Sequence, residues 1–127
     1  MGETTSSAEH PEPEVSSVLV EGIARVTVRG ELTGAARRPL VRCLTDLLLE
    51  HEPLQRVELL LDGVTFMNSA GMAVLVQLQR MGAPRRVEIA LVRPQAAVVR
   101  PLQMSGLWAR FQMVDVPEDL RPGDAGS

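Results

Sequence analysis

The chain has 127 residues, of which 45% are hydrophobic, 23% are charged and only 2% are aromatic. A chain of this length normally folds as one domain around one core, and here that core must be built from aliphatic side chains. The net charge of −3 gives no support for nucleic-acid binding. No apolar run is long enough to span a membrane, and the acidic N-terminus has no signal-peptide pattern. We therefore expect a cytoplasmic protein without nucleic-acid contacts or membrane insertion.

Both ends of the chain are polar and rich in proline or glycine. Residues 1–14 are acidic and show no periodicity, and residues 121–127 are similar material. Segments of this composition bury too little apolar surface to offset the entropy lost on folding. We therefore expect disordered tails at 1–14 and 121–127 on either side of a single domain at 15–120.

The first elements are expected to be two strands and a helix. Residues 17–20 and 23–29 are β-rich runs joined at Glu21-Gly22, and the second run alternates apolar and polar side chains, which predicts a half-buried antiparallel hairpin. A helix follows from about residue 36, with Pro39 in its first turn, where a missing N–H costs nothing. Its apolar stripe predicts a core helix: Leu40, Cys43, Leu44, Leu47 and Leu48. Cys43 is the single cysteine, so no internal disulfide can form, and we expect it to be a small buried hydrophobe.

Residues 57–82 organise the rest of the chain. They indicate a buried strand at 57–61, a loop, and a helix that begins at Ser69, whose apolar residues recur at helical spacing: Gly71, Val74, Leu75, Leu78 and Met81. Ser69 is expected to be the N-cap, which by itself implies only a stabilisation of about 1 kcal/mol. Asp62 is expected to be a turn former after the strand. Gly82 is expected to end the helix in a left-handed conformation before Pro84.

The last elements are shorter. Residues 87–92 predict a strand, and a third helix is expected from Pro94 to about Met104, ending at Ser105-Gly106. Pro101 should kink this helix or move its start to about Val98. A final strand is expected at 111–114, and residues 117–120 are too few for more than a stunted terminal helix.

The residues give little support for an enzyme. Histidine occurs only at His10 and His51, tyrosine is absent, no metal-ligand spacing is present, and the central loop has too few glycines for a nucleotide-binding motif. We therefore expect no catalytic residue, no metal and no cofactor. Arg85 and Arg86 are most simply interpreted as part of a solvated turn.

Three motifs resemble one known family. Phe66-Met67-Asn68-Ser69-Ala70-Gly71-Met72 is similar to the phe-met-asp-ser-ser-gly-leu signature of anti-sigma factor antagonists, which belong to the STAS domain family. Gly30-Glu31-Leu32-Thr33 resembles the family's gly-glu-leu-asp turn. Met104-Ser105-Gly106-Leu107, followed by Phe111, resembles its met-ser-gly-leu-x-x-x-phe run. Together the motifs extend the resemblance over residues 15–114.

The resemblance implies a fold and a switch. The fold is a single α/β STAS-like domain with a mixed sheet of four to five strands and about three to four helices. The unphosphorylated protein binds an anti-sigma factor of the histidine-kinase-like ATPase fold and so releases a sigma factor. That partner uses ATP to phosphorylate the serine matched by Ser69, after which binding is lost. The partner-binding positions implied by the motifs are Glu31, Thr33, Asn68, Ala70, Gly71 and Met72.

The chain departs from the motif around Ser69. Asn68 and Thr33 stand where the family usually has aspartate, and Ala70 replaces the second serine. The loss of the two aspartates removes negative charge around Ser69. This either favours a phosphate on Ser69, whose charge the amides of Ala70, Gly71 and Met72 can tolerate, or removes groups that the kinase requires. The alternative function is therefore a STAS docking subunit of a larger assembly, such as a lipid-transport complex or a signalling scaffold, which is never phosphorylated.

Overall fold

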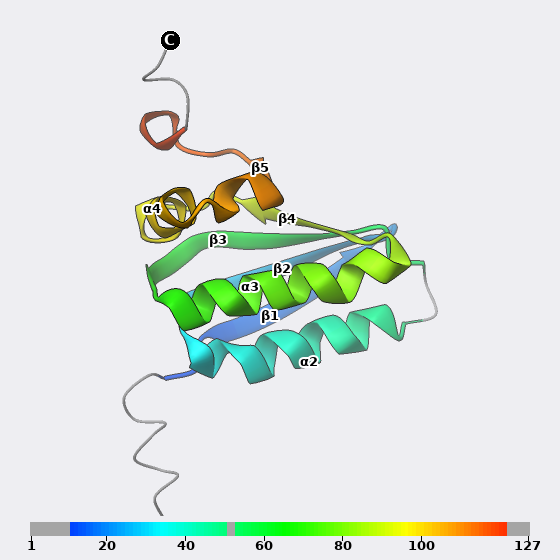
Figure 1. Cartoon of the computed structure of the whole chain (residues 1–127). Coiled ribbons are helices and arrows are strands. Elements are labelled where there is room, and N and C mark those ends of the chain that lie inside the picture. The colour runs from blue at the N-terminus through cyan, green and yellow to red at the C-terminus, as the bar shows by residue number, and fades with distance from the viewer. Residues whose placement is uncertain (1–10, 51–52, 122–127) are drawn as a thin grey trace, which may run out of the picture.

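The computed structural model describes residues 11–50 and 53–121 as one α/β domain, as predicted. Its sheet has the order β1-β2-β3-β4-β5, with an antiparallel first pair and three parallel pairs (Figure 1). The strands are β1 (Glu14–Val20), β2 (Ile23–Leu32), β3 (Arg56–Met67), β4 (Glu88–Val92) and β5 (Gln112–Val114). The helices are α2 (Arg37–Leu48), α3 (Ser69–Gly82) and α4 (Ala96–Ser105), with 3-10 turns η1 (Gly34–Ala36), η2 (Ala83–Arg85), η3 (Leu107–Arg110) and η4 (Glu118–Leu120).

The predicted tails fall largely on residues 1–10 and 122–127, which lie outside the described residues. Of the remaining tail residues, Glu14 is already the first residue of β1, and Pro13 is buried. At the other end, residues 117–120 form only the turn η4, in agreement with the expected stunted helix.

The β1–β2 hairpin forms as predicted, because its turn residues suit it. Glu21 and Gly22 both have positive φ, at 53° and 83°, as a tight two-residue hairpin turn requires. In β2 the buried residues Ala24, Val26 and Val28 alternate with polar neighbours, so one face of the strand is apolar.

The three helices lie on one face of the sheet. Each parallel strand from β2 to β5 is followed along the sheet by the next strand in sequence, and right-handed crossovers of this kind place every connecting helix on the same side. Figure 1 shows α2 and α3 alongside each other against the strands. The core between the two layers is aliphatic, and its largest fully buried side chains include Leu32, Leu40, Leu59, Leu61, Leu75, Leu78, Leu91 and Leu102.

Helix α2 packs through the predicted stripe. Leu40, Leu44 and Leu47 are buried, whereas Cys43 and Leu48 are half-buried at its margins. Pro39 is the third residue of the helix, where its missing N–H removes no intrahelical hydrogen bond.

Strand β3 is longer than predicted. The expected loop after residue 61 is wrong, because β3 continues to Met67 and pairs with the extended end of β2, Gly30 with Val64 and Leu32 with Met67. The pairing of β2 with β3 shifts register between Thr27 and Arg29 and between Gly30 and Glu31, as at a β-bulge. Asp62 is therefore not a turn residue; it lies within the strand, with a carboxylate oxygen 3.8 Å from Nε of Arg93.

The end of α3 also differs from the prediction. Gly82 has a right-handed conformation, with φ of −80°, and the left-handed residue is Arg86, with φ of 59°, after the turn η2. Glycine is needed at 82 for another reason: a Cβ there would lie 2.6 Å from the carbonyl oxygen of Val87. Arg85 is exposed, as expected of a solvated turn, but its guanidinium also donates to the carbonyl oxygen of Leu48 at 3.0 Å.

Helix α4 contains Pro101 within its length. It begins at Ala96, so the expected displacement of its start to Val98 is wrong, and Pro101 is the sixth residue of the helix. At this position the missing N–H removes one intrahelical hydrogen bond near the N-terminus, and the rest of the helix continues. Gly106 ends α4 with φ of 79°, as predicted.

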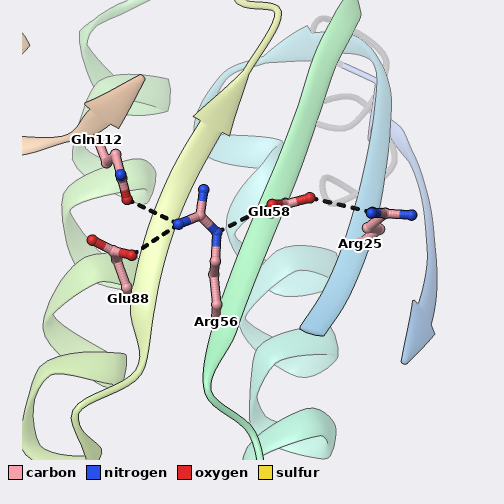
Figure 2. Close-up of polar contacts among 5 residues, drawn as sticks. All are labelled: Arg25, Arg56, Glu58, Glu88 and Gln112. Carbon is pink, nitrogen blue, oxygen red and sulfur yellow. Dashed lines mark hydrogen bonds and ion pairs between the residues drawn. The ribbon is translucent and has the colours of Figure 1, made fainter. Parts of the chain in front are cut away.

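A row of polar side chains joins four strands on the sheet face away from the helices (Figure 2). Arg56 in β3 donates to Glu58 at 3.1 Å, to Glu88 in β4 at 3.1 Å and to Gln112 in β5 at 3.1 Å, and Arg25 in β2 donates to Glu58 at 3.2 Å. Cross-strand pairs of opposite charge stabilise neighbouring strands. The arginines of this row are therefore matched by acceptors within the sheet itself.

Candidate functional site

The N-terminus of α3 is capped by Asn68, not by Ser69. The Asn68 backbone is extended, with φ of −111° and ψ of −177°, and its Oδ1 accepts from the backbone N–H of Gly71 at 2.9 Å. The prediction of Ser69 as N-cap is therefore wrong by one residue, because β3 reaches Met67 and leaves only Asn68 between strand and helix. Ser69 is the first residue of α3 and is exposed, so its hydroxyl lies on the surface.

The start of α3 is held directly against the end of β2. The backbone N–H of Asn68 donates to the carbonyl oxygen of Leu32 at 3.2 Å. A Cβ on Gly71 would lie 1.9 Å from that same oxygen and 2.5 Å from the Leu32 carbonyl carbon. Only glycine permits this approach. The position of Ser69 is thus fixed by two backbone contacts beside it.

The structure divides the six predicted partner-binding residues into two groups. Thr33 is fully buried, and its hydroxyl accepts from the backbone N–H of Ala35 at 3.1 Å, which caps η1. Gly71 is buried as well. Both residues are buried in the free chain, where they shape the backbone next to Ser69, and their predicted role in partner binding stays a prediction.

The other four residues reach the surface in part. Asn68, Ala70, Met72 and Glu31 are each half-buried, and Glu31 pairs with Phe66 across β2 and β3. Met72 also approaches α4, because the Ser105 hydroxyl lies 3.7 Å from its sulfur. We call the surface formed by Ser69 and these four residues the Ser69 surface, and the end of α4 borders it at Met72.

Sequence reasoning missed two exposed apolar residues near these elements. Phe66 is 43% exposed and Met104 is 88% exposed. Both belong to motifs quoted above, and the buried positions Val98 and Leu102 could have placed Met104 on the outer side of α4. Their exposure makes both residues candidates for contact with a partner.

Sequence reasoning also missed an open groove lined by arginines. We call it the arginine groove; it lies between the start of α2 and the start of α3, and its lining consists of Glu12, Gly34, Ala35, Arg37, Arg38, Val41, Arg42, Asn68, Ala70 and Gln77. The sequence could have indicated this charged surface, because Arg37, Arg38 and Arg42 fall outside the buried stripe of leucines in α2.

The described residues include no cluster of histidine, cysteine or carboxylate side chains that could hold a metal ion. Burial raises the pKa of the Cys43 thiol above its ordinary value of 9.0. The nearby charge of Asp46 raises this pKa further, and a hydrogen bond with Ser17 lowers it. The thiol therefore stays protonated and is a poor nucleophile at neutral pH.

Within the part of the chain that the structure describes, no helix has the length and apolar character needed to cross a bilayer.

Known structures share this fold. An anti-sigma factor antagonist from Mycobacterium paratuberculosis has a TM-score of 0.65 and 18% identity, over 85% of this chain and 90% of that one. The antagonist SpoIIAA in its unphosphorylated form gives 0.65 and 18%, over 84% and 90%. A sulfate transporter family protein from Wolinella succinogenes gives 0.60 and 17%, over 81% and 84%.

Sequence comparison identifies the family. No curated protein matches the chain. Residues 14–119, however, match the sequence profile of the STAS domain. This span includes every strand, every helix and the whole Ser69 surface. The chain therefore belongs to the STAS domain family.

Proposed function

We propose that this protein is an anti-sigma factor antagonist and a regulator rather than an enzyme. In its unphosphorylated form it binds an anti-sigma factor of the histidine-kinase-like ATPase fold and so releases a sigma factor. Phosphorylation of Ser69 by that partner, with ATP as the phosphoryl donor, ends the interaction. The setting we propose is the cytoplasm, where ATP and sigma factors are present. The chain itself requires no cofactor.

One observation carries this proposal: the Ser69 hydroxyl is exposed at the first residue of α3, on a rigidly anchored surface. A kinase needs an accessible hydroxyl, and a helix N-terminus stabilises the negative charge that the reaction leaves behind by about 0.3–1 kcal/mol. The amides of Gly71 and Met72 already donate to Asn68, contrary to the expectation that they receive the phosphate. The amides of Ser69 and Ala70 belong to the first turn, where N–H groups have no intrahelical acceptor.

The proposed switch acts at the surface. A phosphate adds about 1.5 to 2 negative charges at neutral pH. Because Ser69 is exposed, that charge stays in water in the free protein and leaves the core intact. In a complex the same charge must be desolvated against the partner, which weakens binding unless a cation is placed to receive it. SpoIIAA, which shares the fold, is known in unphosphorylated and phosphorylated forms.

The experiment that tests this proposal is phosphoryl transfer in vitro. The purified protein is incubated with ATP, Mg²⁺ and each candidate anti-sigma kinase of its genome, and intact mass is measured. We expect a gain of about 80 Da, one phosphoryl group, which is absent in Ser69→Ala and retained in Ser16→Ala, an exposed serine on β1. A gain that persists in Ser69→Ala would assign the modification to another residue and refute this role of Ser69.

A second candidate function is an unmodified STAS docking subunit of a larger assembly, such as a lipid-transport complex or a signalling scaffold. Two observations favour it: the cap beside Ser69 is the neutral Asn68, and the fold is shared with a sulfate transporter family protein. In that case no kinase adds mass to the protein, and a stable complex with assembly subunits forms through the same surface. The mass experiment separates the two functions.

A further inference from the structure

The positive charge of α2 is concentrated on one short segment, where three arginines form no ion pair with a described residue. Arg37, Arg38 and Arg42 are exposed, and Arg38 and Arg42 lie one turn apart on the same side of the helix. Within residues 11–50 and 53–121, none of the three forms an ion pair, and Arg37 donates only to the neutral amide oxygen of Gln77, at 3.0 Å. The sheet-face arginines Arg25 and Arg56, by contrast, are both paired with carboxylates.

Small residues line the arginine groove together with the arginines. They are Gly34 and Ala35 of η1 and Ala70 in the first turn of α3, and a Cβ on Gly34 would lie 3.6 Å from the Cβ of Ala70. Side chains this small let the backbone of another chain approach closely. The groove therefore combines charged and small residues, which suits an extended segment with acidic side chains.

The groove is continuous with the Ser69 surface. Asn68 and Ala70, the two chain neighbours of Ser69, both line it. Arg38 and Arg42 also line a second groove, which includes Ser16 of β1 and the carboxylates of Glu12 and Asp46. The unbalanced positive charge therefore lies in the arginine groove, which contains three arginines and one glutamate.

We propose that the arginine groove docks an acidic, extended segment of the same partner that binds the Ser69 surface. Arginine is suited to this role because its guanidinium binds carboxylates through two parallel hydrogen bonds and is weakly hydrated. Charge complementarity of this kind also accelerates the encounter of two proteins. The inference rests on the proposed function for the identity of the partner, but the acidic chemistry follows from the groove alone.

Docking in the groove links the charge of Ser69 to release of the partner. A phosphate on Ser69 would add negative charge next to residues that line the groove, and charges closer than about 8 Å interact at physiological ionic strength. It would compete with the acidic segment for the arginines. Glu12, which also lines the groove, already supplies one carboxylate there, although it forms no ion pair with the three arginines.

The test uses a fluorescein-labelled hexaglutamate peptide, whose binding to the full-length chain is measured by fluorescence anisotropy at low salt. The triple variant Arg37→Gln/Arg38→Gln/Arg42→Gln is compared with Arg80→Gln/Arg86→Gln/Arg110→Gln, which removes the same charge from exposed positions elsewhere. Each exposed ion pair changes affinity by about 1.4- to 5-fold, so the groove variant should weaken binding at least about threefold. Equal weakening in the control variant, or no binding by the wild type, would overturn the proposal.

Two further measurements separate other occupants of the groove. If Glu3→Gln/Glu9→Gln/Glu12→Gln strengthens peptide binding about threefold or more, the chain's own N-terminal carboxylates occupy the groove, and the proposal is overturned. If the groove variant changes the sedimentation coefficient of the protein in the absence of peptide, a second copy of the chain occupies the groove, and the proposal is overturned. Unchanged peptide affinity in the glutamate variant and unchanged sedimentation in the groove variant support an acidic partner segment.

The peptide assay contains neither kinase nor ATP, so it fails or succeeds independently of the function proposed above. Peptide binding without phosphorylation of Ser69 would leave the groove as a docking site for an acidic segment of an assembly subunit. Phosphorylation of Ser69 without peptide binding would support the proposed phosphorylation switch and overturn the proposal that the groove docks an acidic segment.

Discussion

The close approach of α3 to β2 predicts a large effect from a single methyl group. In Gly71→Ala the new Cβ would lie 1.9 Å from the carbonyl oxygen of Leu32 and 2.5 Å from its carbonyl carbon. Both are backbone atoms at the end of β2, where Leu32 pairs with Met67 of β3, so the clash cannot be relieved by rotating a flexible side chain. The start of α3 must therefore move away from the end of β2.

The magnitude follows from three terms. Overpacking in a tight site costs about 1–3 kcal/mol. The movement also breaks the hydrogen bond from Asn68 N–H to Leu32 oxygen, which contributes about 0.5–1.5 kcal/mol. Alanine recovers up to about 1 kcal/mol through its higher helix propensity. We expect a net loss of about 2 kcal/mol in the free energy of unfolding.

The assay is urea unfolding followed by circular dichroism, with Gly34→Ala as the matched control. A Cβ on Gly34 meets only the Ala70 methyl, at 3.6 Å, so this variant should change stability by less than about 0.5 kcal/mol. Gly71→Ala should lower the midpoint by about 1 M, given the usual dependence of stability on urea. Wild-type stability in Gly71→Ala would show that α3 does not rest on the Leu32 carbonyl and would refute the reasoning.

Three other predictions concern the cap, the sheet face and the buried thiol. Asn68→Ala loses the cap bond to Gly71 and should cost about 1 kcal/mol in urea unfolding, whereas Ser69→Ala should cost less than about 0.5 kcal/mol. Arg56→Ala breaks bonds to Glu58, Glu88 and Gln112 and should cost about 1–2 kcal/mol, with a smaller loss at high salt. Burial raises the pKa of Cys43, so the thiol binds its proton more tightly in the folded state. Its contribution to stability is complete below the ordinary pKa of 9.0 and should be lost as the pH rises above it, which unfolding curves at pH 8–10 can measure.

Each of these has a control in the chain. Asn68→Asp should keep the cap bond and retain stability, and a larger loss in Ser69→Ala than in Asn68→Ala would return the cap to Ser69. Arg93→Ala removes only an exposed ion pair of 3.8 Å and should change stability by less than about 0.5 kcal/mol. Cys43→Ala should flatten stability between pH 9 and 10, because the chain has no tyrosine or lysine to titrate there. A slope that remains in that variant would exclude the thiol as its cause.

Local patterns accounted for most of the fold. The alternation in β2 and the leucine stripe of α2 predicted each element, because burial on one side demands a period of two in a strand and 3.6 in a helix. Where predictions failed, pairing between distant segments was responsible. Residues 62–67 begin with Asp62-Gly63, a pair that favours a turn, yet they form a strand because β2 is extended beside them.

The residues of the candidate site stay a prediction, and the structure corrects one structural detail of it. Asn68 takes the N-cap position expected for Ser69, because β3 extends to Met67, and Ser69 becomes the first residue of α3. Thr33 and Gly71 were expected at the surface because they belong to the motif. A sequence motif records which residues occur together and not which of them are buried.

By itself, the sequence determined the elements, their order and the aliphatic core, since these depend on periodicity and turn residues within a few positions of one another. Only the tertiary structure decided which atoms meet: that Leu32 supports α3, that Thr33 points inward, and that three arginines of α2 form the wall of a groove beside Ser69. The physical reason is that contacts between residues some 30 positions apart are set by how strands pair and helices pack, and no local pattern encodes that distance.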